Sequence, residues 1–138
     1  MKINNLLKII RKIHPEYLIV IVDYNKFRIY NEDAYIPNYL FKYDLHKLKY
    51  YQFIINKIEY LNYLKYHLNK LNINYLILDK HDGYNVLFEN TFANNQYLTY
   101  LKKSKIYCQR MNIIQKIRKL KDFYKINLIK ELVNSYGT

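Results

Sequence analysis

The chain has 138 residues, which is a typical length for one domain, and 51% of them are apolar, which is enough for a packed core. Its formal net charge is +12, and it contains 18 Tyr, no Trp and a single cysteine. One cysteine excludes an internal disulfide and a zinc site built on cysteine pairs, and no apolar run reaches the roughly 18–20 residues of a membrane helix.

The first part of the chain predicts a helix followed by a buried strand. Apolar residues recur at helical spacing over residues 3–13. Pro15 disfavours the helical conformation at His14, so we expect the helix to end there. Residues 17–23 form a continuous β-branched run, which is typical of a strand buried on both faces.

A second strand and a capped helix start are predicted next. Residues 27–30 alternate as a strand after a tight connection at Tyr24-Asn25. Asn31 is suited to cap a following helix through its side chain, and Pro37 should interrupt that helix early. Residues 42–53 have no clean period, and we expect them to be irregular.

The second half of the chain predicts a helix, a hairpin and a long basic helix. Residues 73–78 and 85–88 read as a hairpin around a polar turn, residues 91–96 as a loop and residues 98–133 as a helix. One apolar stripe at helical spacing predicts the first of these helices, and it consists of Ile54, Ile58, Leu61, Leu64, Leu68 and Leu71.

This order of elements predicts an α/β fold with a small mixed β-sheet flanked by helices. We expect an α/β domain over residues 1–96 and a basic helical extension packed on it over residues 97–138. Residues 1–14 are basic and amphipathic, but their apolar pieces are too short for a secretory signal. We therefore expect an intracellular protein that is not secreted, located in an organelle, a viral factory, a nucleoid or a nucleus.

The positive charge is concentrated at the two ends of the chain. Residues 1–14 carry a net charge of +4 and residues 101–138 a net charge of +8, whereas residues 15–100 are neutral. Cationic ends on a neutral body are typical of a protein that binds a polyanion. A solvated helix face and an acidic membrane surface are the alternatives. The excess of Ile, Asn, Lys and Tyr is typical of an AT-rich genome, so counts of basic or aromatic residues do not by themselves locate a site.

Two short segments carry a resemblance to a known family. Residues 14–18 read His-Pro-Glu-x-Leu, and residues 27–34 read Phe-x-x-Tyr-x-Glu-Asp-Ala. In this order and at this spacing they resemble the start of the N-terminal mismatch-recognition domain of the MutS family of DNA repair proteins. A weaker similarity runs from the Asn-Tyr-Leu of residues 62–64 to Leu78. The resemblance covers roughly residues 5–80 and implies a mixed α/β fold in a divergent, stand-alone domain.

The residues that read a mismatch in that family are replaced here. The resemblance implies that a Phe wedges beside the mismatched base and that a Glu two residues later hydrogen-bonds it. The ungapped register places Lys26 and Arg28 at these positions, with Phe27 between them, and Tyr24-Asn25 replaces the family's Gly-Asp pair. We therefore expect contacts with the nucleic-acid backbone without the usual reading of mismatches.

Catalytic chemistry has no support in the sequence. Only Gly83 and Gly137 are present, so a glycine-rich phosphate loop for ATP hydrolysis cannot be built. The histidines are scattered, and Cys108 is better explained as an inert side chain than as a reactive one. We expect no enzymatic activity, no cofactor and no metal.

The sequence therefore predicts a noncatalytic nucleic-acid-binding module, with DNA favoured over RNA and no membrane partner. One alternative is an RNA-binding structural protein of an organellar ribosome, and another is a viral or mobile-element protein that binds another protein. A larger repair, viral or ribosomal assembly is compatible with each. The candidate nucleic-acid-binding residues are Lys8, Arg11, Lys12, Lys26, Phe27, Arg28, Lys102, Lys103, Lys105, Arg110, Lys116, Arg118 and Lys119.

Overall fold

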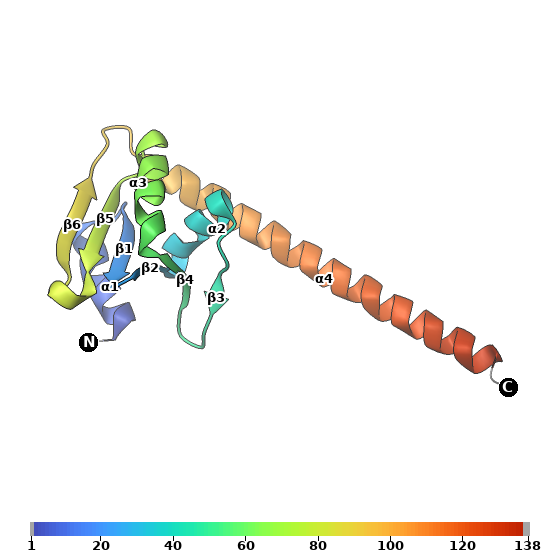
Figure 1. Cartoon of the computed structure of the whole chain (residues 1–138). Helices are drawn as coiled ribbons and strands as arrows, with labels where there is room; N and C mark the ends of the chain where they lie inside the picture. The colour runs from blue at the N-terminus through green and yellow to red at the C-terminus, as the bar shows by residue number, and fades with distance from the viewer. Residues whose placement is uncertain (1, 137–138) are drawn as a thin grey trace. The chain divides into compact units, whose positions relative to one another are not determined.

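The computed structural model describes residues 2–136 and confirms a mixed α/β fold (Figure 1). The chain divides into two units, residues 1–105 and residues 106–138, and each is described by itself. The predicted domain boundary after residue 96 coincides with the start of the last helix, whereas the first unit extends to Lys105. The elements are α1 (Ile3–Ile13), β1 (Leu18–Asp23), β2 (Lys26–Tyr30), the 3₁₀ turn η1 (Asn31–Ala34), α2 (Tyr35–Phe41), β3 (His46–Lys47), β4 (Gln52–Lys57), η2 (Ile58–Tyr60), α3 (Leu61–Lys70), β5 (Tyr75–Asp79), η3 (Lys80–Asp82), β6 (Asn85–Asn90) and α4 (Tyr97–Tyr136).

The six strands form one mixed sheet in the order β3-β4-β2-β1-β5-β6. β1 pairs in parallel with β5, and all other neighbours are antiparallel. β1 and β2 form a hairpin, and α3 carries the chain from β4 to β5 on the other side of that hairpin. Residues far apart in the sequence therefore lie on adjacent strands.

The two faces of the sheet bury different sets of side chains. On one face, residues of β1, β2, β4 and β5 pack with α2, α3 and the start of α4. On the other face, Ile19 and Ile21 of β1 and Leu76 and Leu78 of β5 pack against α1. Figure 1 shows α3 in front of the sheet and α1 behind it. The run over residues 17–23 is apolar throughout because β1 is buried on both faces.

Most of the predicted elements are confirmed, but the prediction for residues 54–57 is wrong. Residues 42–53 also contain the short strand β3 and the start of β4, although they were expected to be irregular. Ile54 lies in β4 opposite Ile29 of β2, and the helix begins only at Leu61. The prediction was wrong because the apolar residues of β4 and α3 together fit one helical spacing by coincidence. Ile54 and Ile55 are β-branched, which favours a strand.

The helix start after β2 also differs from its prediction. Asn31 does not cap a helix; its backbone is left-handed, with φ of 56°, and its side-chain amide donates to Asn4. Pro37 does not interrupt α2, because it lies in the first turn, where a backbone N–H has no partner to lose. Glu32 and Asp33 lie in the first turn of η1, where negative charge suits the positive end of a helix dipole.

α4 is confirmed as a long helix of 40 residues. Its first nine residues belong to the α/β unit, where Tyr97, Leu101 and Ser104 are buried. Within the described part of the chain, no helix is both long and apolar enough to cross a membrane.

Candidate nucleic-acid interface

The alternation of β2 separates its side chains into two sets. Phe27 and Ile29 are fully buried in the core that faces α3. Lys26, Arg28 and Tyr30 point to the other face of the sheet and are partly exposed. The candidate role of Phe27 is therefore corrected: its ring is a core residue, and it cannot reach a ligand.

Lys26 lies in a row of charged residues that crosses three strands. Its cross-strand neighbours are Asp23 on β1 and Lys57 on β4. The Asp23 carboxylate is engaged elsewhere, because Oδ1 bonds His81 and Oδ2 lies 2.8 Å from Arg28 and 3.7 Å from Lys80. The ion pairs formed by the described residues include neither Lys26 nor Lys57. Two adjacent lysines are thus left without a neutralising carboxylate.

Asp23 is an anion that holds its neighbours in place. The hydrogen bond with His81, together with Arg28 and Lys80, lowers the pKa of Asp23 to about 2. A carboxylate with so low a pKa is a poor general base near neutral pH. The ring of His81 also stacks on Tyr24 at a centroid distance of 3.5 Å. Asp23 therefore organises the charged row and is not suited to abstract a proton.

Aromatic rings continue this face toward β4. The rings of Tyr30, Tyr51 and Phe53 lie within about 6 Å of one another, and the Arg28 guanidinium lies 6.0 Å from the Phe53 centroid. A hollow of about 390 Å³ opens between these side chains and Lys80. Cations beside exposed aromatic rings are the side chains on which nucleic-acid phosphates and bases are bound. We call this surface the sheet-face patch, and it consists of Lys26, Arg28, Tyr30, Tyr51, Phe53, Lys57 and Lys80.

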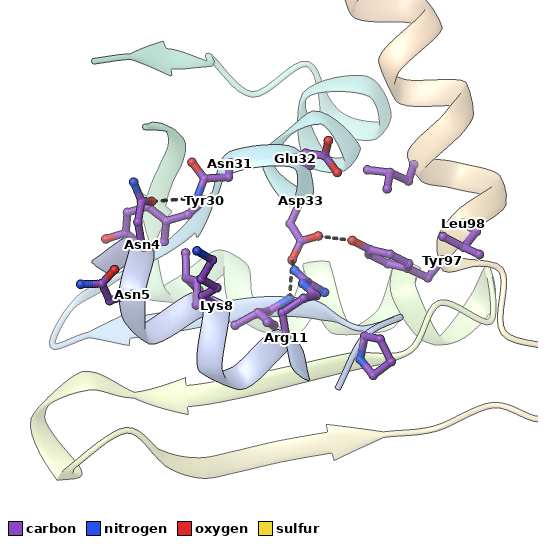
Figure 2. Close-up of a pocket in the computed structure, with 14 residues that line it drawn as sticks. Asn4, Asn5, Lys8, Arg11, Tyr30, Asn31, Glu32, Asp33, Tyr97 and Leu98 are labelled. Carbon is purple, nitrogen blue, oxygen red and sulfur yellow. Dashed lines mark hydrogen bonds and ion pairs between the residues drawn. The ribbon is translucent and has the colours of Figure 1, made fainter. Parts of the chain in front are cut away.

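A second and larger cavity of about 630 Å³ lies beside α1 (Figure 2). Tyr30 lines both the hollow and this cavity. Lys8 of α1 and Glu32 of η1 supply charges of opposite sign to the cavity wall. The cavity therefore lacks the excess of positive charge that a polyanion site needs.

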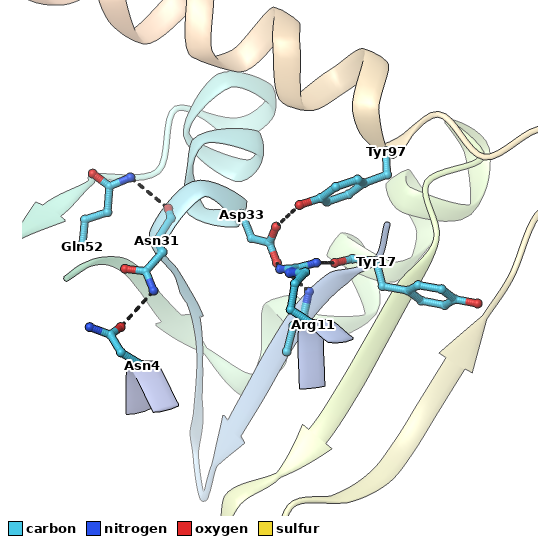
Figure 3. Close-up of polar contacts among 8 residues, drawn as sticks. Asn4, Arg11, Tyr17, Asn31, Asp33, Gln52 and Tyr97 are labelled. Atoms are coloured by element: carbon cyan, nitrogen blue, oxygen red, sulfur yellow. Dashed lines mark hydrogen bonds and ion pairs between the residues drawn. The ribbon is translucent and has the colours of Figure 1, made fainter. Parts of the chain in front are cut away.

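The floor of this cavity is a closed polar network centred on Asp33 (Figure 3). Its carboxylate accepts hydrogen bonds from the Arg11 guanidinium, the Tyr97 hydroxyl and the backbone N–H of Ile19. Arg11 also donates to the backbone carbonyl of Tyr17. Arg11 is thus committed to joining α1 to the sheet and to η1, and it is a weaker candidate for ligand binding than the sequence suggested.

The other predicted residues are distributed over both units. Lys105 pairs with Glu32 at 2.9 Å, and the Lys103 ammonium lies 5.0 Å from the Tyr100 ring. Lys12 and Lys102 are exposed on the α/β unit. The remaining candidates are exposed in the unit of residues 106–138, and they are Arg110, Lys116, Arg118 and Lys119.

Sequence reasoning missed Lys57, Lys80, Tyr51 and Phe53. Lys57 follows Phe53 and Ile55 at a period of two, which would have placed it on one strand face if residues 52–57 had been read as a strand. Its position opposite Lys26 depends on strand pairing, for which no local signal exists. No cluster of three or more potential metal ligands occurs within the described residues.

Comparison with models of known protein families gives no match, and comparison with curated proteins gives no significant one.

Proposed function

We propose that the protein is a noncatalytic nucleic-acid-binding module that holds DNA through the sheet-face patch. The observation that carries this proposal is the lysine pair of β2 and β4. Like charges directly opposite each other on a sheet destabilise it. A phosphate bound between Lys26 and Lys57 would remove that repulsion and release counterions from the DNA. The pair is therefore explained by a polyanionic ligand.

The neighbouring side chains support the same proposal. Arg28, Lys80 and the rings of Tyr30 and Phe53 line the hollow, and Arg28 lies two residues from Lys26 on the same face of β2. Contacts with phosphates position a nucleic acid without reading its sequence, and aromatic rings add stacking that tolerates any base. Such a surface favours binding with little sequence preference.

The order of elements agrees with what the resemblance to the MutS N-terminal domain implies. α1 ends immediately before His14, β1 and β2 form a hairpin, and Glu32-Asp33-Ala34 lies in the turn that leads into α2. Tyr24 has a left-handed backbone, with φ of 55°, where the resemblance places a glycine. In the ungapped register of that resemblance, Lys26 and Arg28 stand at the positions of the mismatch-reading residues, and both are partly exposed on one face of β2. We infer a module of this type in which backbone binding has replaced mismatch reading.

The test removes the lysine pair and leaves the Asp23 contacts intact. We expect K26Q/K57Q to weaken binding to duplex DNA by about tenfold at low salt. We also expect it to reduce the slope of log affinity against log salt by about two, because two phosphate contacts are lost. Fluorescence anisotropy with labelled duplex at two salt concentrations measures both quantities.

The matched control is K65Q/K70Q, which removes the same charge from α3 on the opposite side of the sheet. Equal losses in the two variants would show that only net charge matters, and they would contradict the proposal. A clear preference of the native chain for a mismatched duplex would contradict backbone binding without mismatch reading. Tighter binding of structured RNA than of duplex DNA would instead favour the ribosomal alternative.

A further inference from the structure

The helical unit of residues 106–138 exposes a continuous apolar surface. Its side chains are spaced by four, three, four and four residues, so they follow one another along one side of the helix. Each is between 47% and 69% exposed. A single helix has nothing within its own unit with which to bury them. We call this surface the apolar seam, and it consists of Ile113, Ile117, Leu120, Tyr124 and Leu128.

The steps of the seam are those of a helix that packs along another helix. Alternating steps of four and three place apolar side chains on the contact line of a coiled coil. The additional step of four at Leu128 is a stutter, which locally unwinds such a coil without ending it. Exposed apolar surface of this extent marks an interaction site on a soluble domain. The seam therefore has the form of one strand of a coiled coil.

The charges beside the seam identify the kind of partner. Lys116 lies three residues after Ile113 and four before Leu120, and Lys121 flanks the opposite side of the seam in the same way. Residues 106–136 contain seven Lys and Arg against two acidic residues. No acidic residue is available at these flanking positions to pair with a lysine from another helix.

A second copy of the chain is disfavoured as the partner. In a parallel pair with aligned seams, Lys116 of one chain would face Lys121 of the other. In any pair of two copies, parallel or antiparallel, both helices would carry seven Lys and Arg against two acidic residues over residues 106–136. Two copies would therefore bring together helices of the same net charge, whereas opposite charges beside a seam favour association. A helix with glutamates at its flanking positions would neutralise both lysines.

We propose that residues 113–128 bind an acidic amphipathic helix of another protein as a two-stranded coiled coil. This surface is distinct from the sheet-face patch, so the chain would hold a nucleic acid through one unit and a protein through the other. The cations of the helix would then select an acidic protein partner, in addition to attracting a polyanion.

The test uses the full chain and two synthetic helical peptides as probes. Both peptides repeat leucine at the steps of the seam; one carries glutamate at the flanking positions and the other carries lysine. We expect the acidic peptide to bind, measured by fluorescence anisotropy, and the lysine peptide not to bind. I117Q/L120Q should weaken binding of the acidic peptide by at least about tenfold. I126Q/I129Q, which removes apolar residues away from the seam, should bind it unchanged.

The charge-swapped variant K116E/K121E keeps the seam and tests partner choice independently. This variant should no longer bind the acidic peptide, and it should bind the lysine peptide. Circular dichroism checks that each variant retains its helix. Equal binding by I117Q/L120Q and I126Q/I129Q would show attraction by charge alone and would overturn the proposal. Self-association of the native chain through the seam, loss of duplex DNA binding in I117Q/L120Q, or binding of neither peptide would also overturn it.

Discussion

Asp33 shows how one residue can determine a local architecture. Burial raises the pKa of its carboxyl group, and the Arg11 guanidinium and the donors of Tyr97 and Ile19 oppose that shift. Burial and the adjacent Asp33 carboxylate raise the pKa of Tyr97, so its hydroxyl keeps the proton that it donates. The carboxylate thereby joins α1, β1 and the first turn of α4 through two side chains and one backbone N–H.

We expect D33N to lower the free energy of unfolding by about 2–4 kcal/mol. The amide has no charge to pair with Arg11, and its NH₂ group would face neighbours that are themselves donors. The matched control is E32Q at the neighbouring position. Glu32 is 62% exposed and pairs with Lys105 at the surface, so its loss should cost less than about 0.5 kcal/mol. Urea denaturation followed by circular dichroism measures both values. Equal losses would contradict a structural role for Asp33.

At the scale of single elements, α3 ends in a recognised C-terminal motif, although the sequence has asparagine where glycine is usual. The backbone N–H of Ile73 bonds the carbonyl of Leu68, and the two fully buried side chains belong to the same core. Asn72 between them is left-handed, with φ of 56°. This is the Schellman ending of a helix, in which glycine is the usual residue and asparagine the next best.

We expect N72V to lower the free energy of unfolding by about 1–2 kcal/mol, because a β-branched residue tolerates a positive φ poorly. N72G should stay within about 0.5 kcal/mol of the native chain, because relief of strain offsets the greater entropy of the unfolded chain. N62V is the control, since Asn62 lies within α3, where asparagine and valine have similar helix propensities. A loss in N62V as large as in N72V would assign the effect to valine itself.

Helices and strands could be predicted from the sequence where the residues within a few positions of one another determine them. Pro15 ends α1 and the β-branched run forms β1, because both effects act within a few residues. The alternation of β2 likewise places Lys26 and Arg28 on one face. Ile54 could not be assigned from its spacing, because its place in β4 is determined by pairing with β2. For the same reason Lys57, the second half of the lysine pair, could not be found from the sequence.

At the scale of the whole molecule, the buried core of the described residues is confined to one of the two units. The buried residues in the described part of the chain all lie between Leu18 and Ser104. Residues 106–136 contribute seven cations and the apolar seam. The sheet-face patch lies entirely within the first unit. Folding and the proposed phosphate contacts therefore depend on one unit, whereas the described residues of the other add positive charge without adding to the buried core.

A chain that ends at Lys105 tests this separation. We expect residues 1–105 to unfold cooperatively, with a Tm within a few degrees of that of the full chain, because the whole buried core is retained. Its affinity for duplex DNA should depend less steeply on salt, because the cations of residues 106–136 are absent. The K26Q/K57Q substitutions should reduce its affinity by the same factor as in the full chain, since distant sites contribute independently. Calorimetry and anisotropy measure these quantities. A truncated chain that fails to fold, or in which K26Q/K57Q has no effect, would show that the second unit is needed for the core or for the patch.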